Sequence, residues 1–179
     1  AAAAAAAPAA SVPSGGGSNE ARPRRAALQL KRVLIANRSV AAIRIAHAAE
    51  ELGIETVAVF DPEEDAGALH RRLCKHAVAL PSRGECAAAS PYLDAGALIT
   101  AAKKSGADCV HPGYGFLSES GDFAQQCAAA GLTFVGPPAK ALEIFGDKTA
   151  AKALASSLQP PVPTLTGSVE AFVSAEAAL

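Results

Sequence analysis

Short hydrophobic runs alternate with longer segments of helical periodicity along most of the chain. The first run, RVLIA at residues 32–36, is compact and apolar and predicts a strand. Apolar side chains then recur at the three- and four-residue spacing of a helix and stop at Gly53, a residue typical of a helix C-terminus. A second strand is predicted at TVAVF, residues 56–60, before the turn signal Asp61-Pro62.

The alternation continues downstream and predicts the class of fold. Strands that are separated by helices of ten or more residues need crossover connections, which give a parallel sheet with helices on both faces. The expected fold is therefore α/β and Rossmann-like, with strands 32–36, 56–60 and 108–110 as neighbours and Asn37, Asp61 and His111 at one edge. Further helices are predicted over 65–73, over 93–105, where Gly106 ends the helix, and over 118–130, where Ser118 is the cap and Gly131 ends the helix. Further strands are predicted at 77–80 and 133–135. A loop is predicted over 81–91 and a short helix after Pro137-Pro138.

Both ends of the chain differ in composition from the middle. Residues 1–30 consist largely of alanine, serine, proline and glycine with three arginines and one acid, so they offer little surface for a core and predict disorder before about Leu28. This segment is either a low-complexity tail or an organelle transit segment, for mitochondrion or plastid; without a transit role the expected location is the cytoplasm. Residues 31–146 form the predicted domain, and 147–179, with the proline-rich QPPVPTLTG, are expected to begin a linker.

Composition narrows the function further. Half of the 179 residues are hydrophobic, 18% are charged and the net charge is −1, which fits one ordinary domain and argues against nucleic acid or an anionic membrane as partner. No apolar run has the length of a membrane span. The four cysteines and four histidines lack the spacing of metal ligands, so no metal site is expected and the thiols are expected to be reduced, three of them in apolar surroundings.

The loops expected at the carboxyl edge of the sheet exclude several enzyme classes. A nicotinamide cofactor calls for GxGxxG directly after the first strand, but the chain reads ANRSVAA there. Neither a GxxxxGK[ST] phosphate loop nor a GxSxG elbow occurs. The informative segment is HPGYGFLSE at 111–119, where two glycines flank Tyr114. This is either a loop that touches a ligand or a tight strand–helix connection without one.

A set of longer phrases then resembles the biotin carboxylase family. RVLIANR, ELGIETVAVF, DAGALITAAKKSGADCVHPGYGFLSESGDFAQQCAAAGLTFVGP and FGDKTAAK follow that family in the same order and at nearly the same spacing, over Lys31 to Lys152. The resemblance implies an N-terminal, pre-ATP-grasp domain of a biotin-dependent carboxylase of the acyl-CoA, pyruvate or urea type. Such enzymes are ligases that use ATP with Mg²⁺ and bicarbonate to carboxylate biotin.

The resemblance also implies roles for particular residues. Tyr114 and Gly115 match the family's positions beside biotin, and Lys148 matches the lysine that reaches the phosphates of ATP. Arg44 and Glu51 match a helix face that the family often uses for dimer contacts, so a homodimer, or binding to other carboxylase domains or subunits, is expected. No residue of this chain matches a catalytic position.

The chain departs from the family pattern in four places. ANRSVAA replaces the usual ANRGEIA, so Ser39 and Val40 stand where a glycine and a glutamate are usual. The loop around 83–86 is longer, and 159–167 replace the usual GVPxxPG phrase. The glycine-rich lid, the second lysine, the metal-binding glutamates and the catalytic arginine of the family have no counterpart. We therefore expect a chain that binds no cofactor tightly and is inactive alone; the alternative is a non-catalytic interaction module with the same fold.

Overall fold

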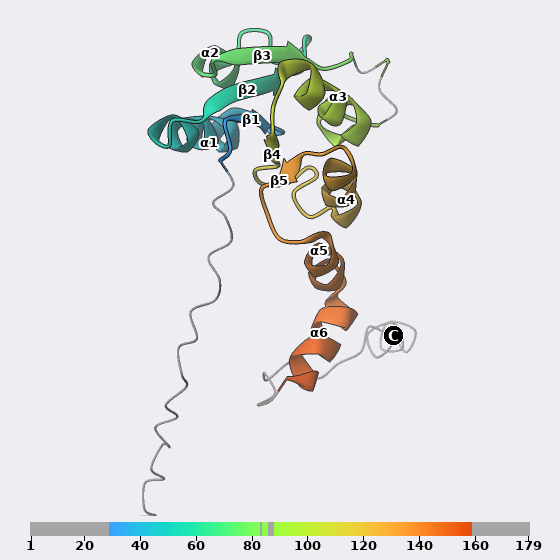
Figure 1. Cartoon of the computed structure of the whole chain (residues 1–179). Coiled ribbons are helices and arrows are strands. Elements are labelled where there is room, and N and C mark those ends of the chain that lie inside the picture. The colour runs from blue at the N-terminus through green and yellow to red at the C-terminus, as the bar shows by residue number, and fades with distance from the viewer. Residues whose placement is uncertain (1–28, 83, 86–87, 159–179) are drawn as a thin grey trace, which may run out of the picture.

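The computed structural model describes residues 29–82, 84–85 and 88–158. Five parallel strands of this part form one sheet in the order β3-β2-β1-β4-β5 (Figure 1). Strands β2, β1 and β4 are hydrogen-bonded neighbours, and Asn37, Asp61 and His111 lie at their carboxyl ends, which confirms the predicted α/β arrangement. The strands are β1 (Arg32–Ile35), β2 (Glu55–Phe60), β3 (His76–Ala79), β4 (Cys109–His111) and β5 (Thr133–Phe134).

Helices cover both faces of the sheet because the strands are apolar on both sides. Leu34 of β1 faces a core that includes α3 (Ala95–Ser105) and α4 (Gly121–Ala129). Its neighbours Val33 and Ile35 face the other side, where they pack with α1 (Ser39–Glu51). The continuous apolar run that predicted β1 is thus the signature of a strand buried on both faces.

Local hydrogen bonds correct three of the predicted helix boundaries. The helix expected over 65–73 is only α2 (Leu69–Leu73), because 61–68 form turns in which Asp65 N donates to Asp61 O (2.8 Å). The helix expected from residue 93 begins at Ala95, after the 3₁₀ turn η1 (Pro91–Leu93), and is capped by Asp94. Ser118 is not the cap of α4; Ser120 is, since its Oγ accepts from Phe123 N (3.1 Å).

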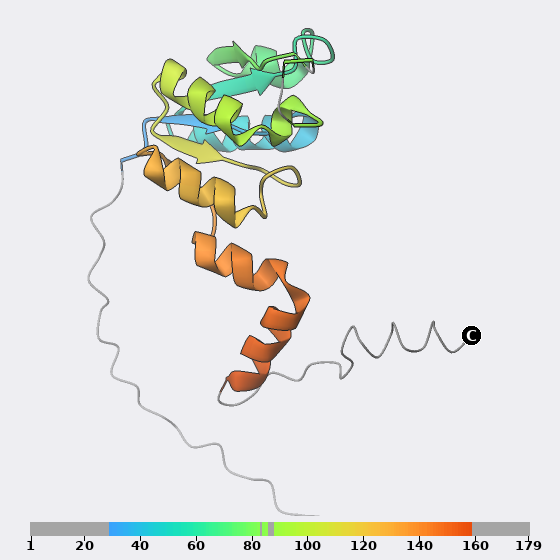
Figure 2. The ribbon, with the colours of Figure 1, turned by 90° about the vertical axis from the view of Figure 1, so that its right-hand side faces the viewer.

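Two further helices project from the sheet. Helices α5 (Ala139–Gly146) and α6 (Lys148–Ser157) follow β5 and lead away from the layered part of the molecule (Figures 1 and 2). Neither helix buries a residue, and Phe145 is 67% exposed. No helix in the described part of the chain has the length and apolarity needed to cross a membrane.

Several expectations concern residues outside the described ranges. They are the disorder or transit role of the segment before Leu28, the longer loop at 83–86 and the altered phrase at 159–167. Within the described part, Cys74, Cys109 and Cys127 are buried free thiols, as expected. Burial raises the pKa of the Cys127 thiol to about 11, so this thiol is neutral at physiological pH.

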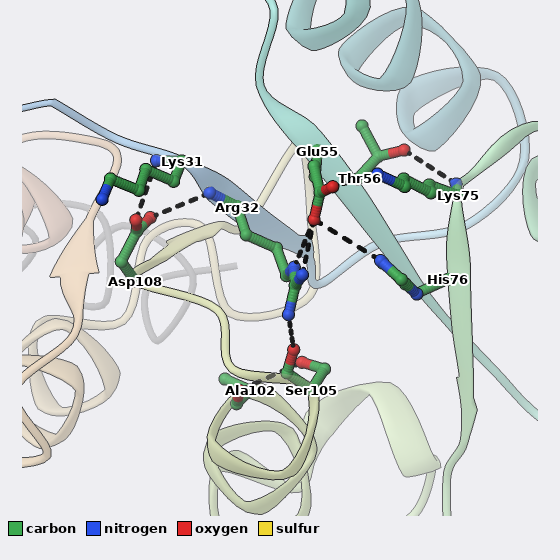
Figure 3. A network of polar contacts seen from close by, with 9 residues as sticks. All are labelled: Lys31, Arg32, Glu55, Thr56, Lys75, His76, Ala102, Ser105 and Asp108. Atoms are coloured by element: carbon green, nitrogen blue, oxygen red, sulfur yellow. Dashed lines mark hydrogen bonds and ion pairs between the residues drawn. The ribbon is translucent and has the colours of Figure 1, made fainter.

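A charged network ties three strands together at the amino edge of the sheet (Figure 3). Arg32 of β1 donates to the Glu55 carboxylate of β2 from Nε (2.8 Å) and Nη2 (2.5 Å), and Lys75 donates to the other carboxylate oxygen. His76 Nε2 of β3 lies 3.5 Å from Glu55 Oε2. Hydrogen bonds from Lys75 and Arg32 lower the pKa of Glu55 from 4.5 to about 2, so the carboxylate is ionised whenever the sheet is folded near neutral pH.

This network predicts the acid sensitivity of the fold. Because the pKa of Glu55 is lower in the folded chain, its contribution to stability is full above pH 4.5 and is lost as the pH falls toward 2. We expect Glu55→Gln to lower the free energy of unfolding at neutral pH, and the difference from wild type to shrink as the pH falls through this range. Urea unfolding at a series of pH values measures it. Glu50→Gln, which removes an exposed carboxylate of α1, is the matched control, and an equal pH dependence of both variants would contradict the prediction.

Candidate functional site at the carboxyl edge

The side chain of Asn37 joins the loop after β1 to the loop after β4. Its Nδ2 donates to Pro112 O (2.8 Å) and to Tyr114 O (2.9 Å), and its Oδ1 accepts from Arg38 N (2.9 Å). Asn37 is only 2% exposed, and an unmade hydrogen bond of a buried amide would be costly. The amide therefore fixes the HPGYG loop to the centre of the sheet.

Gly113 lies so close to Asn37 that a side chain at this position would clash with the amide. Its φ is +69°, and a Cβ at this position would lie 2.6 Å from Asn37 Nδ2. Its backbone N–H donates to His111 Nδ1 (3.0 Å). Gly115 also has a positive φ, +71°, but a Cβ there would meet nothing within 4 Å. The two glycines thus serve different needs: Gly113 needs space and backbone freedom, whereas Gly115 needs backbone freedom alone.

The loop presents one aromatic side chain to solvent and anchors another. Tyr114 is 86% exposed. Phe116, two residues later, has φ +45° and stacks on the buried ring of Tyr92, with 5.1 Å between ring centroids. The exposed ring of Tyr114 therefore stands on a backbone that is held on both sides, a geometry suited to contacting a ligand from outside the sheet.

Tyr92 belongs to a polar cluster that braces the same edge. Its hydroxyl donates to Asp65 Oδ2 (2.7 Å), and Asp65 Oδ1 accepts from Arg38 Nη2 (2.6 Å). Arg38 also donates to Glu64 (2.9 Å), and its guanidinium lies 5.7 Å from the centroid of the Tyr92 ring. Burial and the hydrogen bond to Asp65 raise the pKa of Tyr92, so its hydroxyl stays protonated and remains a donor.

Lys148 lies apart from this loop. It is the first residue of α6, where Asp147 caps the helix by accepting from Thr149 N (2.7 Å) and Ala150 N (3.2 Å). In Figures 1 and 2, α6 lies beyond α5, away from the sheet. The Lys148 side chain is exposed. The fold of the described residues does not bring it together with Tyr114 and Gly115 (Figures 1 and 2).

Arg44 and Glu51 share an exposed face of α1. They lie seven positions apart, which is about two helical turns, and both line a shallow surface with Ile43, His47 and Ala48. Val40 at the start of the same helix is 66% exposed. The structure thus places the two residues as the helical pattern predicts.

The sequence did not reveal the residues that hold the loop. Asn37 was expected at the sheet edge but not as a bridge to Pro112 and Tyr114, because a hydrogen bond over about 75 residues has no local signal. The cluster of Arg38, Asp65 and Tyr92 was also missed. One weak signal existed for it: tyrosine and aspartate are residues that need partners when buried.

Known proteins are similar in sequence to most of this chain. A family model described as biotin carboxylase, N-terminal domain, matches residues 29–142. The chain is 48% identical over 133 residues to the mitochondrial methylcrotonoyl-CoA carboxylase subunit alpha of Oryza sativa subsp. japonica, covering 74% of this chain and 18% of that protein. It is 46% identical over 139 residues to the mitochondrial pyruvate carboxylase of Rattus norvegicus, covering 78% of this chain and 12% of that protein.

Solved structures of carboxylases are similar to this chain in fold as well as in sequence. The biotin carboxylase domain of a single-chain bacterial carboxylase superposes with a TM-score of 0.72 at 48% identity, covering 82% of this chain and 33% of that one. A multifunctional pyruvate carboxylase from Rhizobium etli gives a TM-score of 0.67 at 44% identity, covering 72% of this chain and 13% of that one. The chain spans less than a fifth of the length of the two curated relatives above.

The contrast between the two loop glycines gives a prediction. Gly115→Ala should lower the free energy of unfolding by about 1 kcal/mol, because alanine disfavours a positive φ. Gly113→Ala should cost about 2–4 kcal/mol, since its Cβ must also displace the Asn37 amide. Chemical denaturation of the two variants beside wild type measures both values. Equal losses would show that Asn37 does not pack against Gly113 in solution.

Proposed function

Because this chain belongs to the family of biotin carboxylase N-terminal domains, we propose that it forms the N-terminal part of a unit that carboxylates biotin with ATP and bicarbonate. The observation that carries the proposal is the exposed Tyr114 on a backbone fixed by Asn37. Tyr114 and Gly115 are the residues that would lie beside biotin. The fixed loop would orient the ring of biotin without an ordering cost at each binding event.

ATP and Mg²⁺ have fewer residues to contact in this chain. Full-length carboxylases of this family use biotin, ATP and Mg²⁺. The exposed ammonium of Lys148 fits a phosphate contact, and we propose it for that role. Residues 29–158, with the gaps given above, hold no group of three or more His, Cys, Asp or Glu side chains that could bind a metal ion. No step of the reaction is therefore assigned to Mg²⁺ bound by this chain.

We expect the 179-residue chain by itself to have no bicarbonate-dependent ATPase or biotin carboxylation activity. One lysine–phosphate contact contributes about 1.5–3 kcal/mol, whereas enzymes lower reaction barriers by about 8–23 kcal/mol. The measurement is phosphate release by the purified chain with MgATP, free biotin and bicarbonate, beside Lys148→Ala as control. Turnover above background that disappears in the control variant would show that the chain is catalytic.

The exposed face of α1 favours a second candidate function, that of an interaction module, and we propose self-association as its form. In an antiparallel contact of two α1 helices around a twofold axis near His47 and Ala48, Arg44 of one copy would face Glu51 of the other. Ile43 would face Leu52, and alanine at the centre allows close approach.

Charge exchange tests this contact. Arg44→Glu should weaken the dimer at least about tenfold, because like charges then face each other twice across the symmetric interface. Adding Glu51→Arg should restore dimerisation. Sedimentation equilibrium over a range of concentrations measures it, with Lys103→Glu on α3 as a control for the change in net charge. A wild-type monomer throughout, or a double variant as weak as the single one, would contradict the proposal.

An organelle location is also part of the proposal. The arginine-containing, acid-poor composition of residues 1–30 supports it, as does the word mitochondrial in the names of both relatives described above.

A further inference from the structure

His111 ends β4 and its ring lies directly beneath the loop that follows. Its backbone oxygen accepts from Ala36 N (2.9 Å), which fixes the end of the strand. Its Nδ1 accepts from Gly113 N (3.0 Å). Since a backbone amide can only donate, Nδ1 must carry no proton, and the neutral ring holds its proton on Nε2.

Two side chains therefore hold one backbone group in each of three consecutive loop residues. Asn37 holds Pro112 O and Tyr114 O, while His111 holds the N–H of Gly113 between them. The Asn37 amide does not titrate, whereas the imidazole of a histidine does. Protonation of His111 would convert Nδ1 into a donor that faces another donor, so the Gly113 contact can exist only with the neutral ring.

The surroundings of His111 favour this neutral form. His111 borders an apolar groove of about 400 Å³ that is lined by α1, by strands β1 and β4 and by Val135. The other titratable side chains that line the groove, among the residues described, are Arg44 of α1 and Cys109 of β4; none is a carboxylate. Burial raises the pKa of Cys109 to about 12, so this thiol is neutral, and burial lowers the pKa of His111 below its ordinary 6.5.

We propose that His111 is a positioning residue: its neutral imidazole holds the Gly113 turn that presents Tyr114 and Gly115, and its protonation releases this turn. The release of the turn is a property of the loop alone and requires no ligand. The consequence for biotin, a less well oriented contact at acidic pH, rests on the proposed function.

The chain itself supplies the test through the amide of Gly113. In a ¹⁵N-labelled sample titrated from about pH 8 to about pH 5, the Gly113 amide resonance should shift with the midpoint of the His111 ring. Solvent exchange of this amide, corrected for its intrinsic pH dependence, should become roughly 3- to 10-fold faster as the ring protonates, the loss expected for one hydrogen bond. The Gly106 amide, which caps α3 by donating to Lys103 O (3.1 Å), is the internal control.

Two variants at position 111 distinguish the role of Nδ1 as hydrogen-bond acceptor from other effects of the imidazole ring. His111→Asn places an oxygen acceptor near the position of Nδ1 but does not titrate, so the Gly113 amide should stay protected at every pH. His111→Ala should leave the amide poorly protected at every pH. If the alanine variant fails to fold, wild type and the asparagine variant still decide the question.

The proposal is overturned if the His111 ring titrates while the Gly113 amide does not respond, or if the asparagine variant exchanges as fast as protonated wild type. None of these measurements uses biotin or ATP. A coupled titration, together with biotin binding that is unchanged by Tyr114→Ala in a complete carboxylase, would leave this inference standing and remove the proposed function.

Discussion

The hydrogen bonds of the Asn37 amide determine most of what the carboxyl edge of this sheet can do. Parallel strands end at the same edge, so the loops after β1 and β4 begin side by side, but nothing in the sheet itself fixes their paths. One buried amide provides that restraint by donating to Pro112 and Tyr114 while it accepts from Arg38. Because the donors and the acceptor are all used, a shift of the loop that breaks these bonds is costly, as is a side chain at position 113.

The ANRSVAA departure lies at the start of α1, next to the residues that hold this edge. Ser39 occupies the left-handed region, with φ +55°, a conformation that costs a residue other than glycine about 1–2 kcal/mol. The first turn of α1 also lacks an acidic residue to complement the positive end of the helix dipole. Yet Asn37 and Arg38, which precede the altered positions, keep their contacts to the HPGYG loop and to Asp65. The departure therefore affects stability at the start of α1 rather than the geometry of the loop.

Features that depend on neighbouring residues could be predicted from the sequence, whereas contacts between residues distant in sequence could not. The strands, and the parallel pairing of β1 with β2 and β4, followed from local apolar runs and the need for crossovers. The ends of α1, α3 and α4 followed from glycines. Ser118 and Ser120 are equivalent as local signals for the cap of α4; the turn from Gly115 to Ser118 decides between them. Helix α2 starts later than its sequence pattern predicts for a similar reason, since residues 61–65 form a turn in place of the first part of the helix. Contacts such as Asn37 with Pro112 and Tyr92 with Asp65 join distant segments, and only the fold reveals them.

The two candidate ligand contacts differ in how firmly the chain prepares them. Tyr114 stands on a backbone held by Asn37, His111 and the stacked pair of Phe116 and Tyr92, so its position relative to the sheet is set before any ligand arrives. Lys148 stands on a helix with no buried residue, and its own helix cap at Asp147 orients only the local backbone. Catalysis by positioning requires both reacting groups to be held, with errors of about 1 Å already costly. A chain that fixes the loop proposed to contact biotin, but not the lysine proposed to contact phosphate, is thus suited to position one reactant. The proposed chemistry requires other parts of a carboxylase to place the other.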